Sequence, residues 1–194
     1  MTTRIGVLGG TFDPPHLGHL VAAAEVCFAL ELDQVLLAPT SAQPLKPPPV
    51  ATALERWDMC RLATADDDLL EVTDVDLSRG GTTYTVDTLR DLHARLPGAE
   101  LYFITGADAL ATLPQWKDPE LLPTLATFVG VTRPGHSFPM LETPHRLVEI
   151  PAMAVSSTDV RDRVKAGLPI RYLVPHAVAQ YIADNGLYSG GIDE

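Results

Sequence analysis

The sequence predicts an α/β protein that is built on a doubly wound parallel sheet. Short apolar segments of strand length alternate with longer segments of helical periodicity along its 194 residues. Such alternation indicates right-handed crossovers that place helices on both faces of a parallel sheet. A glycine-rich turn directly after the first predicted strand supports this class, because the ligand-binding loops of such sheets follow their strands.

The predicted elements follow one another with short connections. Strands are expected at residues 4–8, 34–38, 69–75, 100–105, 127–132 and 147–150. Helices are expected at 17–30, 53–65, 85–96, 108–113, 158–166 and 175–185. The chain shows neither an internal repeat nor a linker, so we expect a single domain over residues 1–194 whose C-terminal helical part spans about 156–188.

Individual elements carry further signals. Ser156 and Asp159 are spaced as a capping box at the start of a helix. Trp57 aligns with Ala53 and Cys60 on one face of its predicted helix, which favours a place in the core. The proline-rich residues 44–49 are typical of a stiff surface loop.

Composition excludes some classes of function. A net charge of −11 argues against non-specific binding to nucleic acid or to an anionic membrane. The six acids between residues 64 and 77 are expected on a solvated surface. Cys27 and Cys60 lie in separate helical patterns and resemble the buried thiols of a cytoplasmic protein. The longest apolar stretch is too short to span a bilayer, and no signal peptide is evident.

Residues 9–19, Gly-Gly-Thr-Phe-Asp-Pro-Pro-His-Leu-Gly-His, carry most of the functional information. They join a buried strand to a helix start, where unpaired first-turn amides and the helix dipole favour a phosphate. The glycines allow close approach of a ligand to the backbone. His16 and His19 are three residues apart, so both rings should lie side by side on the first turn.

Other interpretations of this segment were weighed. A histidine pair at this spacing also occurs on surfaces and beside reactive sites, so the pair alone leaves that interpretation open. Zinc would need further ligands, and no nearby Cys or carboxylate supplies them. The chain has no Gly-Lys pair for a Walker A loop, and no two glycines of the segment stand two apart as the dinucleotide fingerprint requires.

The segment resembles the signature of nucleotidyltransferases whose helix begins with H-x-G-H, and among them the bacterial nicotinate-nucleotide adenylyltransferases. Four further segments resemble this family in the same order, and the resemblance covers residues 4–188. They are residues 81–89, residues 106–108 with Trp116 after them, residues 133–135, and residues 155–161.

The resemblance implies a Rossmann-like nucleotidyltransferase fold and the transfer of AMP from ATP to nicotinate mononucleotide. Mg²⁺ is implied as the companion of ATP, although no carboxylate cluster marks residues that would bind the metal. The expected partners are these two small molecules, with no nucleic acid and no membrane. A phosphate monoester is already anionic at neutral pH, so the reaction needs positioning and charge stabilisation rather than a strong base.

The ATP site is expected to use helix starts and cations. His16 and His19 should contact the α-phosphate, and Ser157, Thr158 and Arg161 the β- and γ-phosphates. Asp108 matches the family's ribose-binding acid, or else caps a short helix. The expected ATP contacts are Gly9, Gly10, Thr11, Phe12, His16, His19, Gly106, Asp108, Ser157, Thr158 and Arg161. The expected catalytic residues are His16, His19, Lys46 and Arg161.

The mononucleotide site is expected to combine an aromatic ring with backbone amides. Trp116 should stack on the pyridinium ring, or else pack its loop against the protein. The family resemblance assigns the carboxylate of nicotinate to the amides of Thr85 and Lys117, and the phosphate or ribose side to Arg133. Lys46 is either the cation between the substrates or an ordinary exposed lysine. The expected contacts are Asp13, Lys46, Tyr84, Thr85, Trp116, Lys117 and Arg133.

Two other functions stay open at this point. Phosphopantetheine adenylyltransferases and cytidylyltransferases share the first segment, and nicotinamide mononucleotide is a second possible acceptor. The relatives with other acceptors lack the segment around Tyr84 and Thr85 and the placement of Trp116. A non-catalytic nucleotide-binding protein is the other possibility, which the loss of one histidine would favour. Both histidines are present.

Overall fold

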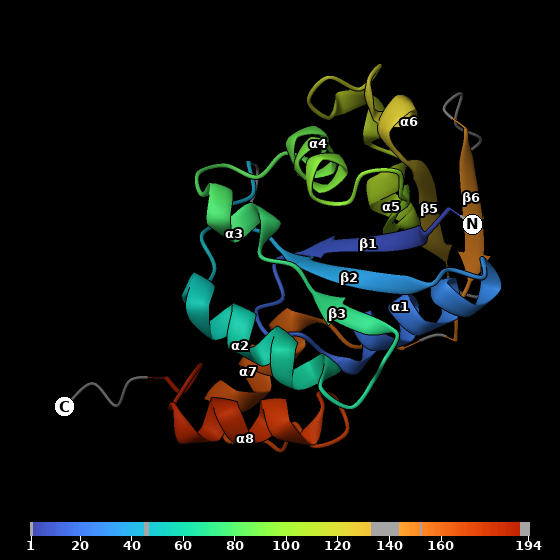
Figure 1. Ribbon diagram of the computed structural model, residues 1–194. Coiled ribbons are helices and arrows are strands. Elements are labelled where there is room, and N and C mark those ends of the chain that lie inside the picture. The colour runs from blue at the N-terminus through green and yellow to red at the C-terminus, as the bar shows by residue number, and fades with distance from the viewer. Residues whose placement is uncertain (1, 45–46, 133–143, 152, 191–194) are drawn as a thin grey trace.

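Six parallel strands form the centre of the molecule. The computed structural model describes residues 2–44, 47–132, 144–151 and 153–190. The strand order is β3-β2-β1-β4-β5-β6 (Figure 1), and every neighbouring pair is parallel. The strands are β1 (Arg4–Gly10), β2 (Gln34–Pro39), β3 (Leu70–Val72), β4 (Glu100–Gly106), β5 (Thr127–Thr132) and β6 (His145–Glu149). The predicted doubly wound parallel sheet is confirmed.

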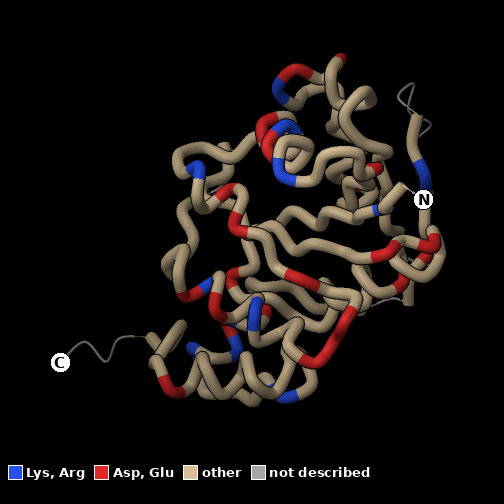
Figure 2. The backbone as a smooth tube through the Cα atoms, viewed as in Figure 1, with Lys and Arg blue, Asp and Glu red and all other residues tan. Residues whose placement is uncertain are grey.

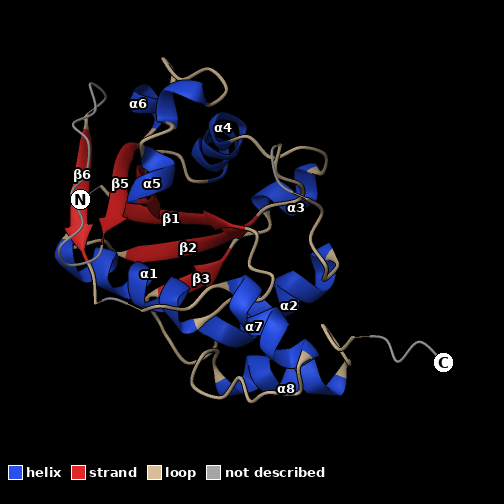
Figure 3. Ribbon diagram, turned by 180° about the vertical axis from the view of Figure 1, so that it is seen from behind, coloured by secondary structure: helices blue, strands red, loops and turns tan. Residues whose placement is uncertain are grey.

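Helices cover both faces of this sheet, as Figures 1 and 3 show from opposite sides. On one face lie α3 (Val75–Arg79), α4 (Thr85–Arg95), α5 (Ala107–Leu110) and α6 (Leu122–Leu125). On the other lie α1 (Leu17–Ala29) and α2 (Ala53–Thr64), with α7 (Ser157–Lys165) and α8 (His176–Asp184) packed beyond α2. A 3₁₀ turn spans Leu113–Gln115.

Three apolar clusters hold these layers together. Successive strand residues point to opposite faces, so Val7 belongs to the cluster under α4 and Leu8 to the cluster under α1. A third cluster joins α2 to the C-terminal helices through Met59, Val160 and Val178. Each of these fully buried side chains stabilises the fold by about 1.5–3 kcal/mol relative to an exposed position.

The structure corrects the predicted strand at residues 69–75. Only Leu70–Val72 form β3, because this edge strand pairs with β2 alone and Asp74 already caps the short helix α3. Helices α3 and α6 were not predicted, since five and four residues are too few to show a helical period.

The acidic run between residues 64 and 77 is only partly a solvated surface. Acidic residues gather on the segment between α2 and β3 (Figure 2), but Asp76 is buried and accepts a hydrogen bond from the Thr88 hydroxyl at 2.6 Å. Burial raises the pKa of Asp76. Cys27 and Cys60 are free and buried, as predicted. No helix in the described part of the chain is long and apolar enough to cross a membrane.

Candidate active site

Several predicted site residues follow the carboxyl ends of neighbouring strands: Thr11 and Phe12 come directly after β1, and Asp108 comes after β4. Strand β1 pairs with β2 on one side and with β4 on the other, so the chain changes direction across the sheet between β1 and β4. Ligands of such sheets bind in the crevice outside this switch point. The end of β1 lies beside the end of β2, with Gly10 opposite Pro39.

The two glycines that end β1 are covered by an aromatic ring, so the strand continues through the glycines that were expected to form a turn. Phe12 follows them with a φ of 51° and is 1% exposed. A Cβ on Gly10 would lie 2.9 Å from Cζ of Phe12, and one on Gly9 would lie 3.1 Å from Cζ of Phe103. These contacts explain why both positions are glycine.

His16 and His19 stack on each other at the start of α1. Their ring centroids are 3.7 Å apart with an interplanar angle of 21°, and the edge of Phe12 contacts His19 at a centroid distance of 4.9 Å. A Cβ on Gly18 would lie 3.1 Å from the ring of His16. The H-x-G-H spacing therefore has a steric cause, because the first ring needs the space over the glycine.

The fold sets the protonation of the pair. The His16 amide donates to Nδ1 of His19 at 3.2 Å, so the neutral imidazole of His19 carries its proton on Nε2. Burial lowers the pKa of His19 well below its ordinary value. It also lowers the pKa of His16 to about 4, against a smaller opposing effect of Asp159. At neutral pH both rings are uncharged hydrogen-bond donors.

The backbone at this helix start is less open than the sequence suggested. The Leu17 amide donates to the carbonyl of Leu173 at 2.9 Å. The expectation that the first-turn amides are unpaired is therefore wrong for Leu17, because the segment before α8 folds against it. It is also wrong for His19, whose amide donates to the carbonyl of His16 at 2.9 Å. In contrast, Nδ1 of His16 is buried and has no partner among the residues that the structure describes. At this helix start, the described residues therefore offer the side chain of His16 as a free polar group, and not the amide of Leu17.

We expect the buried histidines to make stability depend on pH. Unfolded His16 takes up a proton at a pKa of 6.5, whereas the folded side chain stays neutral down to a pH of about 4. The folded pKa is the lower one, so this contribution to stability is present above pH 6.5 and is lost as the pH falls through that window. When the pH is lowered from about 7.5 to about 5, the free energy of unfolding should fall less in the His16→Gln variant than in the wild type. Urea titrations at the two pH values measure this difference. Equal losses in the two proteins would contradict the assigned shift.

The start of α7, which lies late in the sequence, contacts the segment of residues 9–19. Ser156 caps this helix, and its side chain and that of Asp159 form the predicted capping box. The Ser157 hydroxyl donates to the carbonyl of Pro14 at 2.8 Å. The predicted phosphate-binding residues of both segments are thus brought to one place.

Arg161 is held by its own helix and by the loop after β1. Its Nη1 donates to the backbone carbonyl of Asp13 at 2.7 Å, and its Nη2 donates to the Thr158 hydroxyl at 3.2 Å. The side chain of Arg161 remains 26% exposed. Asp13, which was expected to contact the mononucleotide, is 4% exposed, and its carboxylate accepts hydrogen bonds from Val50, Ala51 and Tyr188.

Four of the expected mononucleotide residues, Tyr84, Thr85, Trp116 and Lys117, lie near the start of α4. Thr85 is the first residue of α4, so its amide has no acceptor within the helix. Lys117 reaches this helix start, with its Nζ 2.8 Å from Oδ2 of Asp87 and 4.7 Å from the centroid of the Tyr84 ring. The sequence analysis assigned Lys117 a role through its backbone alone. In the structure its side chain also links the loop around Trp116 to α4, through the ion pair with Asp87.

Trp116 is half-buried beside the same helix start. It contacts Phe103 and Phe128 edge to face, at centroid distances of 6.0 and 6.1 Å. Its indole N–H donates to the Thr112 hydroxyl at 3.0 Å. The ring thus packs the loop down.

Asp108 is exposed after the end of β4 and makes no capping hydrogen bond at the start of α5, where Gly106 is the N-cap. This geometry does not support the capping alternative for Asp108. Lys46 and Arg133 lie outside the described residues.

Comparison with known proteins decides the family. The family description "cytidylyltransferase-like" matches residues 7–163. A curated relative from Leifsonia xyli, named probable nicotinate-nucleotide adenylyltransferase, is 52% identical over 95% of this chain and 94% of its own length. A relative of the same name from Saccharopolyspora erythraea is 53% identical over 98% of this chain and 92% of its own.

The chain belongs to the nicotinate-nucleotide adenylyltransferase family. The resemblance found in the sequence motifs is therefore confirmed. Solved structures agree on the fold. A Plasmodium falciparum nicotinic acid mononucleotide adenylyltransferase complexed with NaAD has a TM-score of 0.78 at 20% identity and covers 96% of this chain and 97% of its own. A putative nicotinate-nucleotide adenylyltransferase from Vibrio parahaemolyticus has a TM-score of 0.72 at 17% identity, covering 94% and 99%.

This adenylyltransferase chain contains a buried arginine that sequence reasoning missed. Arg56 is 1% exposed, and its Nη1 donates to the carbonyls of Thr11 and Thr40 at 2.8 Å each. Its Nη2 donates to the carbonyl of Ser41 at 3.4 Å. One guanidinium therefore links the loop after β1 to the loop after β2, at the edge where the family's first segment lies.

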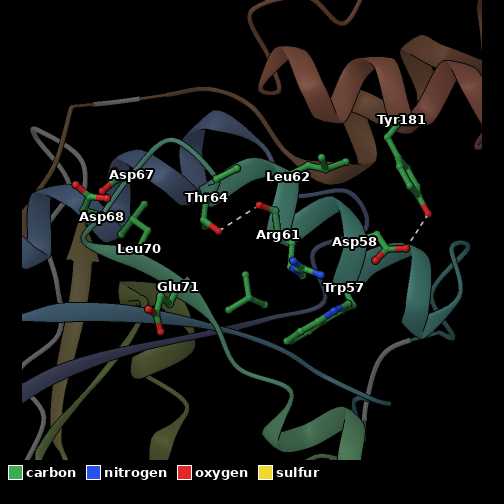
Figure 4. Close-up of a pocket in the computed structure, with 12 residues that line it drawn as sticks. Trp57, Asp58, Arg61, Leu62, Thr64, Asp67, Asp68, Leu70, Glu71 and Tyr181 are labelled. Atoms are coloured by element: carbon green, nitrogen blue, oxygen red, sulfur yellow. Dashed lines mark hydrogen bonds between the residues drawn. The ribbon is translucent and has the colours of Figure 1, made fainter.

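The neighbouring Trp57 is not a core residue, which corrects the prediction. It is half-buried and lines an open pocket of about 740 Å³ between α2, β3 and α8, together with Arg61 and Asp58 (Figure 4). Arg56 takes the inner face of α2 because three carbonyls pair with its charge. The residues that line this pocket include none of those expected in the adenylyltransferase site. No group of three or more potential metal-binding side chains occurs within the described ranges.

Proposed function

We propose that this chain transfers AMP from ATP to nicotinate mononucleotide, which yields nicotinate adenine dinucleotide and pyrophosphate in the biosynthesis of NAD. The observation that carries the proposal is the stacked, uncharged histidine pair at the start of α1, at the switch point of the sheet. Relatives about half identical over nearly the whole chain are named for this activity.

The reaction is an in-line displacement at the α-phosphorus of ATP. A 5′-phosphate oxygen of the mononucleotide forms the new bond to phosphorus, the bond to the bridging oxygen breaks, and pyrophosphate leaves with the electron pair. The attacking oxygen is already anionic, so no described group has to act as a base. ATP enters as its Mg²⁺ complex, and the metal reduces repulsion among the phosphates.

On the ATP side the protein offers donors that need no reorganisation. The Nε2–H of His19 is fixed by the hydrogen bond to Nδ1 of the same ring and can donate to an oxygen of the transferring group. Arg161 keeps an exposed part of its guanidinium for the β- and γ-phosphates. Ser157 already donates its hydroxyl proton to Pro14, so we assign its backbone amide to the phosphates.

On the mononucleotide side the start of α4 and the loop at Trp116 form the specificity site. The free amide of Thr85 suits a carboxylate acceptor, and the amide of Lys117 supplies a second donor. The Trp116 ring contacts the core through its edges and is half-buried, so stacking on a pyridinium face remains compatible with its packing. Asp108 is exposed without a capping role and is assigned to a ribose.

The acid substrate should be at least about tenfold better than its amide in kcat/KM, since an unpaired donor pair costs about 1–3 kcal/mol. The amide group of nicotinamide mononucleotide would turn an N–H donor toward the Thr85 donor. Pyrophosphate release with ATP and a panel of nicotinate mononucleotide, nicotinamide mononucleotide and phosphopantetheine measures this preference. Equal rates with acid and amide would remove the nicotinate assignment, a preference for phosphopantetheine would change the acceptor, and no turnover with any acceptor would indicate a nucleotide-binding protein.

We further propose that the enzyme is cytoplasmic and folds as one domain. The two free, buried thiols suit a reducing compartment. The third apolar cluster packs α7 and α8 onto α2 of the sheet region, which supports a single folding unit.

A further inference from the structure

The carboxylate of Asp13 is a buried junction between three parts of the chain. It accepts the amide of Val50 at 2.7 Å and the amide of Ala51 at 3.1 Å, from the segment that leads into α2. It also accepts the hydroxyl of Tyr188 at 2.7 Å, from the turn after α8. These three donors engage both carboxylate oxygens, so the side chain is used within the protein.

The same residue fixes Arg161. The backbone carbonyl of Asp13 accepts Nη1 of Arg161 at 2.7 Å, and the carboxylate oxygen Oδ2 lies 3.9 Å from that nitrogen. Within the described part of the chain, the two polar contacts that Arg161 makes outside its own helix are both to Asp13. A shift of Asp13 would move the guanidinium that faces the β- and γ-phosphates.

Tyr188 is placed to control Asp13. Its ring is 9% exposed and belongs to the same apolar cluster as Val160, one residue before Arg161. Burial raises the pKa of the Tyr188 hydroxyl, with the hydrogen bond to Asp13 acting in the same direction. The hydroxyl therefore stays protonated and donates at neutral pH.

We propose that Tyr188 is a positioning residue for adenylyl transfer, which holds Asp13 so that Asp13 in turn orients Arg161 toward the triphosphate of ATP. The inference rests on the proposed function for the identity of the nucleotide. It assigns a role in the ATP site to a residue 27 positions beyond Arg161, in a turn that none of the recognised motifs includes.

The test is ATP binding by calorimetry, with Mg²⁺ and without an acceptor. Tyr188→Phe removes the hydroxyl and keeps the ring, and it should raise the Kd for ATP about fivefold. Tyr181→Phe is the matched control, because the Tyr181 hydroxyl donates to Oδ2 of Asp58 at 3.3 Å on the outer side of α2 (Figure 4). Both variants lose a hydroxyl–carboxylate bond of the C-terminal region, and only Tyr188→Phe should weaken ATP binding.

A second arm separates orientation of Arg161 from general loosening. In an Arg161→Ala background, Tyr188→Phe should weaken ATP binding no further, because the group that it positions is gone. Unchanged ATP affinity in Tyr188→Phe, or a full additional loss in the double variant, would overturn the proposal. Tyr188→Met, which also lacks a donor and fits an apolar cluster, replaces the phenylalanine variant if that variant does not fold.

Failure of this inference and failure of the proposed function give different results. The binding assay contains no mononucleotide, so a wrong acceptor assignment leaves it unaffected. Normal turnover of nicotinate mononucleotide together with unchanged ATP affinity in Tyr188→Phe would reject the role of Tyr188 alone.

Discussion

His19→Ala should lower kcat/KM by at least about 30-fold, which corresponds to about 2 kcal/mol of lost transition-state stabilisation. The side chain is pre-oriented by the His16 amide and by stacking on His16, so its N–H meets the transferring phosphoryl group without reorganisation. Steady-state pyrophosphate release at saturating and limiting ATP measures the effect and separates kcat from KM.

The matched control for this variant is His176→Ala. His176 likewise lies in the first turn of a helix, α8, but it is exposed and was not expected in the site. Its replacement should leave kcat/KM within about twofold of wild type, since surface changes rarely matter. A folded His19→Ala protein with turnover close to wild type would remove His19 from the reaction.

Arg56→Leu should lower the free energy of unfolding by about 3–5 kcal/mol. The change leaves three carbonyls at the ends of β1 and β2 without their donor, in a place that water reaches poorly. Burial lowers the pKa of Arg56, and the charge of Asp13 is the largest opposing effect. The buried charge of the guanidinium is therefore destabilising unless its hydrogen bonds to the carbonyls compensate for the lost hydration. Urea unfolding followed by far-UV circular dichroism measures the loss.

The control is Arg61→Leu on the same helix. Arg61 is exposed and lines the open pocket of Figure 4, so its replacement should change the free energy of unfolding by less than about 0.5 kcal/mol. Arg56→Lys should lie between the two, because an ammonium group keeps the charge but cannot reach carbonyls from two loops with a planar fork. Similar losses in the two leucine variants would show that the buried hydrogen bonds of Arg56 contribute little.

The sequence was sufficient for the elements whose signals are local. Long periodic segments and strongly apolar strands appear where they were expected, and the capping box at Ser156 was predicted correctly. The short helix at Val75–Arg79 was missed because its start is defined by where β3 stops pairing with β2, which is a tertiary event. The same limit applies to Trp57 and Arg56. The helical pattern of α2 places both residues near its inner face. Which of the two side chains points inward is decided by the carbonyls of two distant loops that bind Arg56.

The candidate site shows the same division. The segments that hold His16, His19 and Ser157 can be recognised by their resemblance to a known family, and the structure brings the start of α7 against the loop after β1. The hydrogen-bond partners of a side chain cannot be predicted in this way. Asp13 belongs to the most recognisable segment of the chain, yet its partners come from residues 50, 51 and 188, and no local pattern predicts them.

The bonds from Ser157 to Pro14 and from Arg161 to Asp13 join residues that are 143 and 148 positions apart. During synthesis β1 and α1 emerge early, whereas Ser157 and Arg161, which we propose as ligands of the triphosphate, emerge later. Contacts of such long sequence separation form late, after the intervening chain has been ordered. A nascent chain can therefore build most of its sheet and still lack the C-terminal part of the proposed nucleotide site, which would tie the onset of ATP binding to completion of the C-terminal helices.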